Sequence, residues 1–252
     1  MLRLTLLGTG AAGGVPLYGC ECSACKRARE QAAFERKPCS AMLEWGRGGV
    51  KERLLIDAGI MDLHSRFAAG TYHGFLLTHF HVDHVQGLFH LRWGNTSPIP
   101  VWCPDDPQGC ADLLKHSGCL DFKPLFQHGE SFQINRLTIT PLAMKHSRPT
   151  MGFVFEYGIM SVAYLTDTDG LPAQTLDWLM ERPRLDAIVM DCSFPPDSDN
   201  ENHSNLETAR QLNEKLKPKE FIITHLNHDL DRWLMENGVP SWVTIGRDGL
   251  EI

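Results

Sequence analysis

The segment LLTHFHVDHVQGL, residues 76–88, constrains the possible folds and functions of this chain more than any other stretch. Directly after an apolar run it carries four metal-binding side chains within six residues: His79, His81, Asp83 and His84. In an extended chain alternate side chains share a face, so His79 and His81 can bind one ion. A turn into a helix would bring Asp83 and His84 to a second position nearby. Imidazole and carboxylate groups suit zinc, manganese or iron, so the segment predicts two neighbouring metal ions at a strand end.

A second cluster, GCECSAC at residues 19–25, brings three thiols close together at Cys20, Cys22 and Cys25. Thiolates this close repel one another unless a cation holds them. A structural zinc ion needs four protein ligands, so the cluster predicts a zinc site to which it supplies three ligands, with the fourth elsewhere in the chain. The alternative is a set of unrelated buried cysteines, because cysteine is among the most frequently buried residue types.

The course of the chain favours one domain over residues 1–252. Short strand-like segments recur from end to end, and FEYGIMSVAY is typical of a hairpin that turns near Gly158. Helical periodicity is seen at residues 81–93, 171–182, 203–216 and 230–238. Neither an internal repeat nor a Pro/Gly/Ser-rich linker divides the sequence. We therefore expect two sheets packed together and covered by helices.

Composition limits the expected cellular location and binding partners of the chain. No run of about 18 apolar residues is present, so no membrane-spanning helix and no membrane partner are expected. The N-terminus resembles a first strand rather than a signal peptide, and the eight cysteines are spread along a long chain, which together favour the cytoplasm. The net charge of −7 argues against a stable nucleic-acid complex, which needs a basic surface. A small anionic substrate is compatible with it, because bound divalent cations reverse the local field.

The motif H-x-H-x-D-H at His79–His84 resembles that of the metallo-β-lactamase superfamily. Further elements of that superfamily follow in its order: Asp57 in LLIDAG, His146 in TPLAMKHS, Asp167 in AYLTDT and His225 in FIITHL. Alone, each has an ordinary explanation, since a strand-end aspartate is commonly a turn or cap residue. Together they make the resemblance specific. It implies an α/β fold, the αββα sandwich of two mixed β-sheets flanked by helices.

The resemblance also implies a ligand set. Three histidines would hold the first ion: His79, His81 and His146. Asp167 would bridge this ion to the second, together with a water or hydroxide. Two ions lower the pKa of the shared water and stabilise an in-line displacement, so attack by the bridging hydroxide is implied.

For the second ion the implied ligands are Asp83, His84 and His225. Asp83 is counted both as a ligand and as a catalytic residue. Asp57 would orient the ligands from behind them. A metal-dependent hydrolase is the activity that this arrangement implies.

The position of His225 suggests the missing zinc ligand. In THLNHDL, His228 comes three residues later, beyond the strand end, and can turn toward the cysteine loop. We therefore predict that His228 closes a zinc-binding loop at residues 19–26. Cys39 is the alternative; His228 is favoured because a distant ligand closes a larger loop and limits the unfolded chain more. The remaining cysteines are assigned no role: Cys103, Cys110, Cys119 and Cys192.

The cysteine loop, the histidine motif and the stretches MDCS and THLNHDLDRWLMENGVPS together resemble the PhnP family, phosphodiesterases of the carbon-phosphorus lyase pathway of phosphonate breakdown. The resemblance implies hydrolysis of 5-phospho-α-D-ribosyl 1,2-cyclic phosphate to ribose 1,5-bisphosphate, with activity on 2′,3′-cyclic nucleotides. It implies a homodimer as well. Mn²⁺ or Zn²⁺ would occupy the two catalytic positions and Zn²⁺ the cysteine site, since thiolates select zinc.

Two further residues are candidates for the substrate side. His203, in ENHSNLET, corresponds by resemblance to a histidine that supplies a proton to the leaving sugar oxygen. Its alternative is an exposed residue at a helix entry capped by Asn202 or Ser204. Arg148, two residues after His146, is a candidate for the distal 5-phosphate or a structural arginine.

Two other functions share the metal motif. One is a tRNA-maturation endonuclease, which would need a basic arm that this sequence lacks. The other is a non-catalytic metal-binding accessory protein of the same fold.

Overall fold

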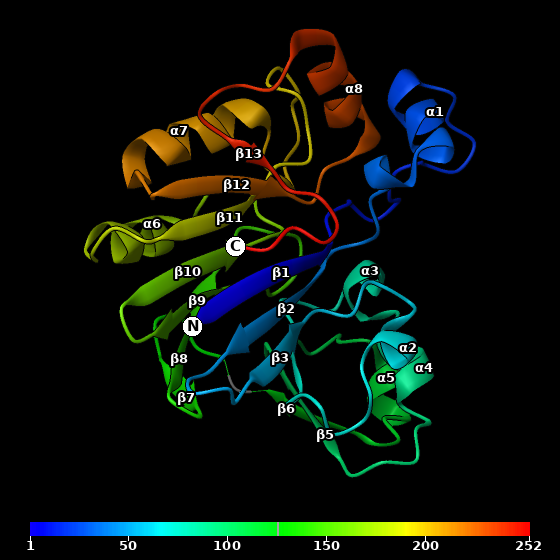
Figure 1. The fold of residues 1–252 in the computed structure, drawn as a ribbon, viewed down its shortest axis with the longest axis vertical. Helices are drawn as coiled ribbons and strands as arrows, with labels where there is room; N and C mark the ends of the chain where they lie inside the picture. Colours follow the sequence, from blue (N-terminus) through cyan, green and yellow to red (C-terminus); the bar gives the residue numbers. More distant parts are fainter. Residues whose placement is uncertain (125) are drawn as a thin grey trace.

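The computed structural model describes residues 1–124 and 126–252, which form four layers in the order helices, sheet, sheet, helices (Figure 1). The predicted αββα sandwich is confirmed. Strands β1 to β6 form one sheet and β7 to β13 the other, each in an order that follows the chain. Because each sheet has one face toward the other sheet and one toward helices, central strands such as that at residues 187–191 are buried on both faces.

The first sheet begins antiparallel and continues parallel. Strands β1 to β3 are antiparallel neighbours, whereas β3 to β6 run parallel. Its strands are β1 (Leu2–Gly8), β2 (Ser40–Trp45), β3 (Glu52–Ile56), β4 (Phe75–Leu76), β5 (Ile99–Cys103) and β6 (Leu120–Pro124). The parallel half places the ends of β3 and β4 side by side, where the histidine motif begins.

The second sheet has the same mixed character. Its strands are β7 (Phe132–Ile134), β8 (Leu137–Ala143), β9 (Met151–Tyr157), β10 (Met160–Leu165), β11 (Ala187–Asp191), β12 (Glu220–Thr224) and β13 (Thr244–Ile245). Strands β7 to β10 are antiparallel and β10 to β13 parallel. The predicted hairpin joins β9 to β10, where Gly158 has a φ of 65° that favours glycine.

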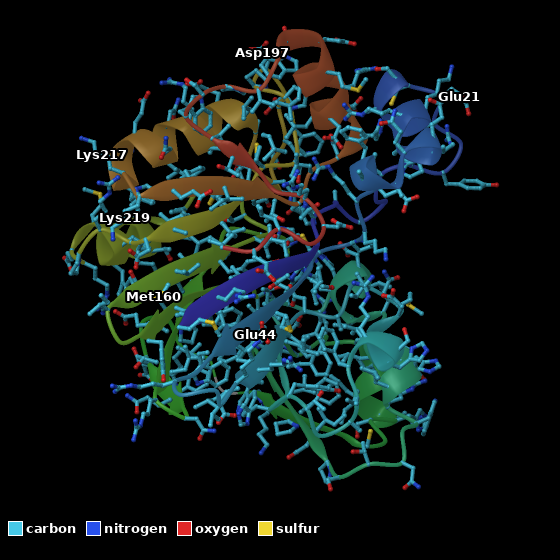
Figure 2. The ribbon with its side chains drawn as sticks, viewed as in Figure 1. Glu21, Glu44, Met160, Asp197, Lys217 and Lys219 are labelled. Atoms are coloured by element: carbon cyan, nitrogen blue, oxygen red, sulfur yellow. The ribbon has the colours of Figure 1, made fainter. Side chains whose placement is uncertain are left out.

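The core between the sheets is built from large apolar side chains of both inner faces. Trp45, Phe153, Phe155 and Tyr164 are completely buried there. Charged side chains such as those of Lys217 and Lys219 lie on the outer surface (Figure 2). Burial of apolar area at about 25 cal/mol per Å² makes this layer the main source of stability.

Helices cover the outer faces. Against the second sheet pack α6 (Ala173–Met180), α7 (Leu206–Leu216) and α8 (His228–Asn237); near the first sheet lie α2 (Leu63–Arg66), α3 (Val82–Val85), α4 (Leu88–Leu91) and α5 (Ala111–Lys115). α1 (Ser23–Glu30) and the 3-10 helix η1 (Ala32–Phe34) lie beside α8 and were not predicted. In the described residues no helix is both long and apolar enough to cross a membrane.

The predicted helix at residues 81–93 is broken into α3 and α4. Gly87 sits between them, and a Cβ atom there would lie 2.4 Å from the carbonyl oxygen of Ile60. The backbone of this segment therefore packs directly on the loop that follows β3. This close packing brings the histidine motif against Asp57.

Candidate active site

Three strand ends deliver side chains to one edge of the sandwich. Asp57 follows β3, Asp167 follows the β10 strand by two residues, and His225 follows β12. All three have a left-handed backbone, with φ values of 55°, 55° and 60°. This conformation is uncommon for residues other than glycine, and such strained residues concentrate at functional sites.

The first predicted group of ligands converges. His81 Nδ1 lies 2.8 Å from His79 Nε2 and 3.1 Å from His146 Nε2. Burial lowers the pKa of His79 well below its usual value, lowers that of His81 to about 4 and lowers that of His146. The three imidazoles are therefore neutral near pH 7, which is the form that binds a metal ion.

The second predicted group lies beside the first. Asp83 Oδ2 is 3.4 Å from His84 Nε2 and 3.8 Å from His225 Nε2. Burial would raise the pKa of Asp83, but His225 and His84 more than offset this and lower it. The Asp83 carboxylate is thus available as an anionic ligand.

Asp167 lies between the two groups, as expected of a bridging ligand. Its Oδ1 atom is 3.3 Å from His225 Nε2 and 3.8 Å from His79 Nε2, while Oδ2 is 3.3 Å from His84 Nε2. Burial disfavours the charge of Asp167, but His225 and His84 outweigh it and hold the pKa well below the usual range.

The donor set fits divalent metal ions. Within residues 1–124 and 126–252, His84 Nε2 and His225 Nε2 are buried without a hydrogen-bond partner. A buried unsatisfied polar atom costs about 1–3 kcal/mol, so a native site needs something to satisfy it. Ligands at about 2.0–2.2 Å from one ion lie at separations like those found here, with carboxylate oxygens 3.3 to 3.8 Å from these nitrogens.

Groups behind the ligands orient them. Asp57 Oδ2 lies 2.7 Å from His84 Nδ1, as the sequence resemblance implied, and Ser193 Oγ lies 2.9 Å from His225 Nδ1. The carbonyl oxygen of Asn202 is 3.0 Å from His146 Nδ1. In each case the far nitrogen is left free to bind metal, an arrangement that raises affinity and holds the ring.

His203 lies against this cluster rather than at an exposed helix entry. Its ring stacks on that of His225 with centroids 4.6 Å apart and lies 5.0 Å from the ring of His146. His203 Nδ1 is 2.8 Å from Asp191 Oδ2. Burial would lower the pKa of His203, but the charge of Asp191 prevails and raises it to about 9.

Asp191 was not predicted as a site residue, although a sequence signal existed. It ends the fully buried strand β11, AIVMD, as Asp57 follows β3 in LLIDAG. Besides contacting His203, its carboxylate accepts hydrogen bonds from the backbone N–H of Thr168 and from Ser193 Oγ. Asp191 therefore connects His203 with Ser193, which in turn holds His225.

Arg148, the candidate for the distal phosphate, is engaged elsewhere. Its guanidinium contacts Asp106 in an ion pair of 2.7 Å and donates to the carbonyl oxygens of Phe80 (3.0 Å) and Gly109 (2.8 Å). The Asp106 side chain is only 2% exposed. The structure therefore favours the structural alternative for Arg148, because its donors already hold the loops after β4 and β5 together.

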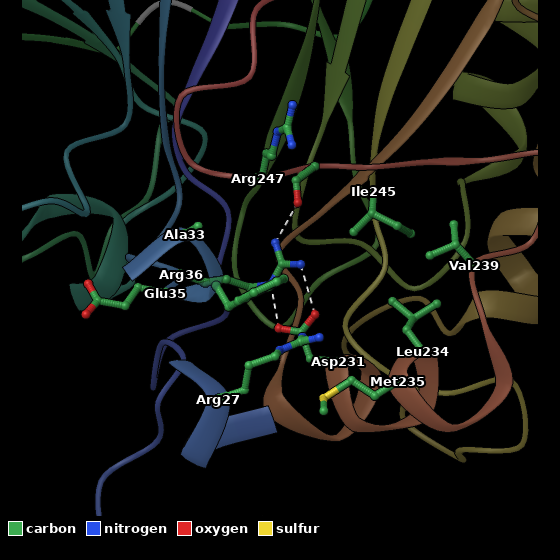
Figure 3. Close-up of a pocket in the computed structure, with 12 residues that line it drawn as sticks. Arg27, Ala33, Glu35, Arg36, Asp231, Leu234, Met235, Val239, Ile245 and Arg247 are labelled. Atoms are coloured by element: carbon green, nitrogen blue, oxygen red, sulfur yellow. Dashed lines mark hydrogen bonds and ion pairs between the residues drawn. The ribbon is translucent and has the colours of Figure 1, made fainter. Parts of the chain in front are cut away.

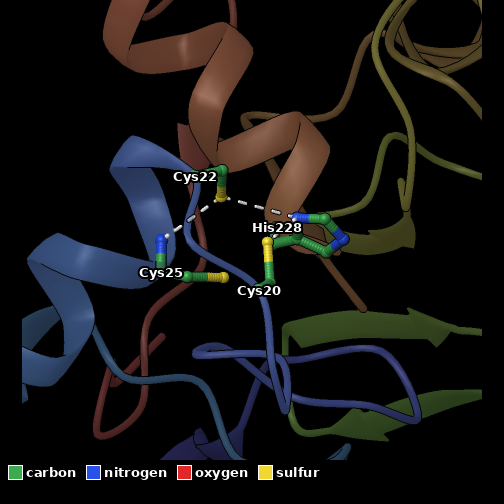
Figure 4. A group of neighbouring side chains, drawn as sticks. All are labelled: Cys20, Cys22, Cys25 and His228. Carbon is green, nitrogen blue, oxygen red and sulfur yellow. Dashed lines mark hydrogen bonds between the residues drawn. The ribbon is translucent and has the colours of Figure 1, made fainter.

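The four predicted zinc donors also come together. The side chains of Cys20, Cys22 and Cys25 point toward His228, the first residue of α8 (Figure 4). His228 Nδ1 lies 3.6 Å from both Cys20 Sγ and Cys22 Sγ, as expected for donors at about 2.3 Å and 2.0 Å from one zinc ion.

Cys39, the alternative fourth ligand, lies apart from this loop. It is completely buried, and its sulfur is 3.8 Å from Thr224 Oγ1 and 4.0 Å from Thr166 Oγ1. Burial raises the pKa of its thiol, which therefore stays protonated. The geometry favours His228.

Comparison with known families agrees with this geometry. The family model described as "Beta-lactamase superfamily domain" matches residues 52–226, more than half of the chain. The chain belongs to the metallo-β-lactamase superfamily. This fold uses divalent metal ions such as zinc, and the matched range contains all seven predicted ligands of the paired site.

Curated relatives of this superfamily member have diverse names. An octanoyltransferase of Porphyromonas gingivalis is 27% identical over 99% of this chain and 51% of its own length. The coenzyme PQQ synthesis protein B of Pseudomonas aeruginosa is 26% identical over 59% of this chain and 55% of its own. The chain thus spans about half the length of the curated relatives it matches.

Solved structures match over nearly the whole chain. A new diphosphatase from the PhnP family has a TM-score of 0.80 at 24% identity, covering 100% of this chain and 97% of that one. Zn²⁺-bound PqqB from Methylobacterium extorquens has a TM-score of 0.76 at 20% identity, covering 99% of both chains. Human tRNase Z, short form, has a TM-score of 0.68 at 17% identity, covering 99% of this chain and 98% of that one. These likenesses show the fold.

Proposed function

We propose that this chain is a metal-dependent phosphodiesterase that opens the cyclic phosphate ester of a small phosphorylated sugar. The substrate proposed is 5-phospho-α-D-ribosyl 1,2-cyclic phosphate, with ribose 1,5-bisphosphate as product and 2′,3′-cyclic nucleotides as further substrates. One observation carries the proposal: His203, paired with Asp191 at 2.8 Å, lies beside a cluster that can hold two ions. Cleavage of a phosphodiester uses both the ion cluster and the histidine. The ions would activate the attacking water, and the histidine would protonate the alkoxide that leaves.

Each part has a separate task. When bound, paired divalent ions supply an activated water and neutralise charge on the phosphoryl oxygens. The protein side chains fix the geometry: Asp167 lies between the two histidine groups, and Asp57 holds His84 from behind. Holding the reactants in place in this way contributes much of a hydrolase's rate.

His203 is proposed to protonate the leaving sugar oxygen. Its Nδ1 is engaged by Asp191, so Nε2 is the atom left to pass a proton. The carboxylate favours the protonated ring and fixes its orientation. General acid catalysis of this kind contributes about 10²- to 10⁴-fold in rate.

The comparisons support this choice at the level of chemistry. The PhnP-family diphosphatase and human tRNase Z are both named for cleavage at phosphate, and both match the chain over nearly its full length. The net charge of −7 favours a small substrate over tRNA, whose binding needs basic side chains. The names octanoyltransferase and PQQ synthesis protein B belong to relatives of which this chain covers about half.

The metal content and assembly are part of the proposal. Two ions, Mn²⁺ or Zn²⁺, are assigned to the paired site and one Zn²⁺ to Cys20, Cys22, Cys25 and His228. The chain is proposed to act as a homodimer in the cytoplasm, without a stable nucleic-acid or membrane partner. Plasma emission spectrometry and light scattering on the purified protein would test the metal content and the homodimer.

A substrate panel tests the activity. The metal-loaded protein would be assayed with bis(p-nitrophenyl) phosphate, 2′,3′-cyclic AMP, the cyclic ribosyl phosphate and pre-tRNA. We expect turnover of the first three, with the highest kcat/KM for the cyclic ribosyl phosphate. Cleavage of pre-tRNA without turnover of the cyclic ribosyl phosphate would favour the endonuclease. Turnover of none would favour the accessory protein and reject the proposal.

A further inference from the structure

One of the cavities lined by the described residues lies away from the paired metal site. It has a volume of about 340 Å³ and lies where α1 and η1 face α8 and the residues around β13 (Figure 3). Small-molecule sites have volumes of about 300–1,000 Å³, so this cavity can hold a ligand. From its lining we propose that it binds a small amphipathic anion, an apolar body carrying one carboxylate or phosphate head.

One end of the cavity is polar and carries an excess positive charge. The Arg36 guanidinium pairs with both carboxylate oxygens of Asp231, at 2.6 and 2.9 Å, so these two charges neutralise each other. Arg27 and Arg247 are the other cations of the lining; Arg27 lies beside this pair, whereas the side chain of Arg247 points away from it (Figure 3). The carboxylate of Glu35, which also lines the cavity, points away from this end (Figure 3).

Arg27 has an unused donor at this end. Its Nε atom is buried and, within the described part of the chain, lacks a hydrogen-bond partner. The Phe34 ring lies 3.9 Å from its guanidinium carbon and holds the side chain in place. An anionic head would pair best with the guanidinium of Arg27, because charge-assisted hydrogen bonds are about twice as strong as neutral ones.

The opposite wall is apolar. Leu234, Met235, Val239 and Ile245 lie together on one side of the Arg36–Asp231 pair (Figure 3). Met235 and Val239 remain 39% and 58% exposed, as does 39% of Phe34 on the other side. An apolar ligand body placed here would cover surface that the fold leaves open to water. A cation at one end and an aliphatic wall at the other define the ligand class.

The site is distinct from the catalytic one but adjoins the cysteine loop. Arg27 comes two residues after Cys25 on α1, and Asp231 three residues after His228 on α8. A ligand in the cavity would therefore contact both helices that supply the predicted zinc donors. Because it bridges them, it would stabilise their packing.

Calorimetric titration of the full-length, metal-loaded protein tests the proposal with defined probes. The anions 4-phenylbutyrate and phenyl phosphate would be titrated, with neutral 4-phenylbutanol as the control for the charged head. At least one anion should bind saturably and about tenfold more tightly than the alcohol, since a hydrogen bond to a charged group is worth about 1.5–3 kcal/mol. The tighter of the two anions identifies the head group.

Matched variants locate the binding. Arg27→Gln should weaken anion binding about tenfold and leave alcohol binding unchanged, whereas Arg182→Gln, which removes another arginine stacked on an aromatic ring, should change neither. Val239→Glu should weaken anion binding far more than Val239→Gln, because only the first adds a negative charge to an exposed wall position. Zinc content and phosphodiesterase turnover report whether each variant is intact.

Three results would overturn the proposal: no saturable binding of either anion, binding of both anions no tighter than that of 4-phenylbutanol, or unchanged anion binding in the folded Arg27→Gln variant. None of these readouts requires turnover, and Arg27→Gln separates binding in this cavity from binding of an anion at the paired metal site.

Discussion

His203 and Asp191 form a pair at the edge of the metal cluster, with 2.8 Å between Nδ1 and Oδ2. The His203 ring also stacks on the metal-ligand candidate His225 at 4.6 Å. One carboxylate at the end of β11 thereby positions a group that can exchange a proton within contact of the site where two ions fit. The same pair would also orient His203 as a further metal ligand, since His146, Asp167 and His203 lie close enough to share an ion.

Replacing His203 by alanine should slow turnover of bis(p-nitrophenyl) phosphate by about a hundredfold or more, because a general acid is lost. Both ions of the paired site should stay bound, since none of the seven predicted ligands is removed. Turnover and metal content would be measured on the same preparation. Unchanged turnover would contradict the role of His203, and loss of an ion would instead make it a ligand.

Asp191→Asn should retain His203 but remove the charge that favours its protonated form. We expect kcat to fall about tenfold or more with KM little changed, and the limb of the pH–rate profile assigned to the acid to move to lower pH. Asp186→Asn serves as a control, because that carboxylate pairs with the exposed Lys219 at the opposite end of β11 from Asp191. A normal pH profile in Asp191→Asn would show that the pair does not tune His203.

His228→Ala should release one zinc ion per chain, because the cysteine loop would keep only three protein ligands. The free energy of unfolding should fall as well, since the ion links α1 to α8. Cys39→Ser should keep the full metal content, as Cys39 lies against Thr166 and Thr224 rather than the loop. Emission spectrometry of the two variants decides whether His228 or Cys39 is the fourth zinc ligand. Zinc loss from Cys39→Ser would reverse the assignment.

Arg148→Gln should lower stability by about 2 kcal/mol and leave KM for the cyclic ribosyl phosphate unchanged, because Arg148 holds loops together. A rise in KM without a stability change would restore Arg148 to the substrate site. Urea denaturation and steady-state kinetics measure the two effects.

The partner of Arg148 makes part of this stability pH-dependent. Burial opposes ionisation of Asp106, but hydrogen bonds from the backbone N–H groups of Gln108 and Gly109 and the charge of Arg148 prevail and lower its pKa. A carboxyl group whose folded pKa is depressed stabilises the fold above its unfolded pKa of about 3.8 and loses that contribution as pH falls below it. Wild type and Asp106→Asn should therefore differ most in stability near neutral pH and converge in acid. A constant difference across pH 2 to about 6 would contradict this.

Removing the ions with a chelator should abolish turnover and lower the melting temperature, since ions bind only the folded site. At a free ion concentration about 100 times Kd the expected loss is about 2.7 kcal/mol. Adding Mn²⁺ or Zn²⁺ back to the chelated protein should restore both. Calorimetric melting alongside the assay separates loss of ions from unfolding, and full activity in the chelated protein would exclude a metal-dependent reaction.

The sequence by itself was enough to predict the fold, which the structure confirms, and a set of candidate metal ligands. One strand is followed by four candidate ligands at spacings that suit two ions: His79, His81, Asp83 and His84. Strand-end residues such as Asp57 and Asp167 can be recognised as polar residues after apolar runs. Local spacing is enough here because a strand end fixes where the next few side chains point. The helices α6, α7 and α8 could likewise be predicted, since helical periodicity depends only on residues close together in the sequence.

Only the tertiary structure decided which distant groups meet. Asp191 pairs with His203 and Arg148 with Asp106, partners that lie 12 and 42 residues apart and that the sequence did not predict. The meeting of Cys20 with His228, 208 residues away, was predicted, but packing is what brings the two side chains together. The cavity between α1 and α8 is likewise lined by residues from both ends of the chain. Such contacts depend on how two sheets and their helices pack, and the polar residues alone do not encode a partner. From the sequence, an arginine such as Arg148 could therefore bind a phosphate or pair with a buried carboxylate. Only the packing of the loops decides which.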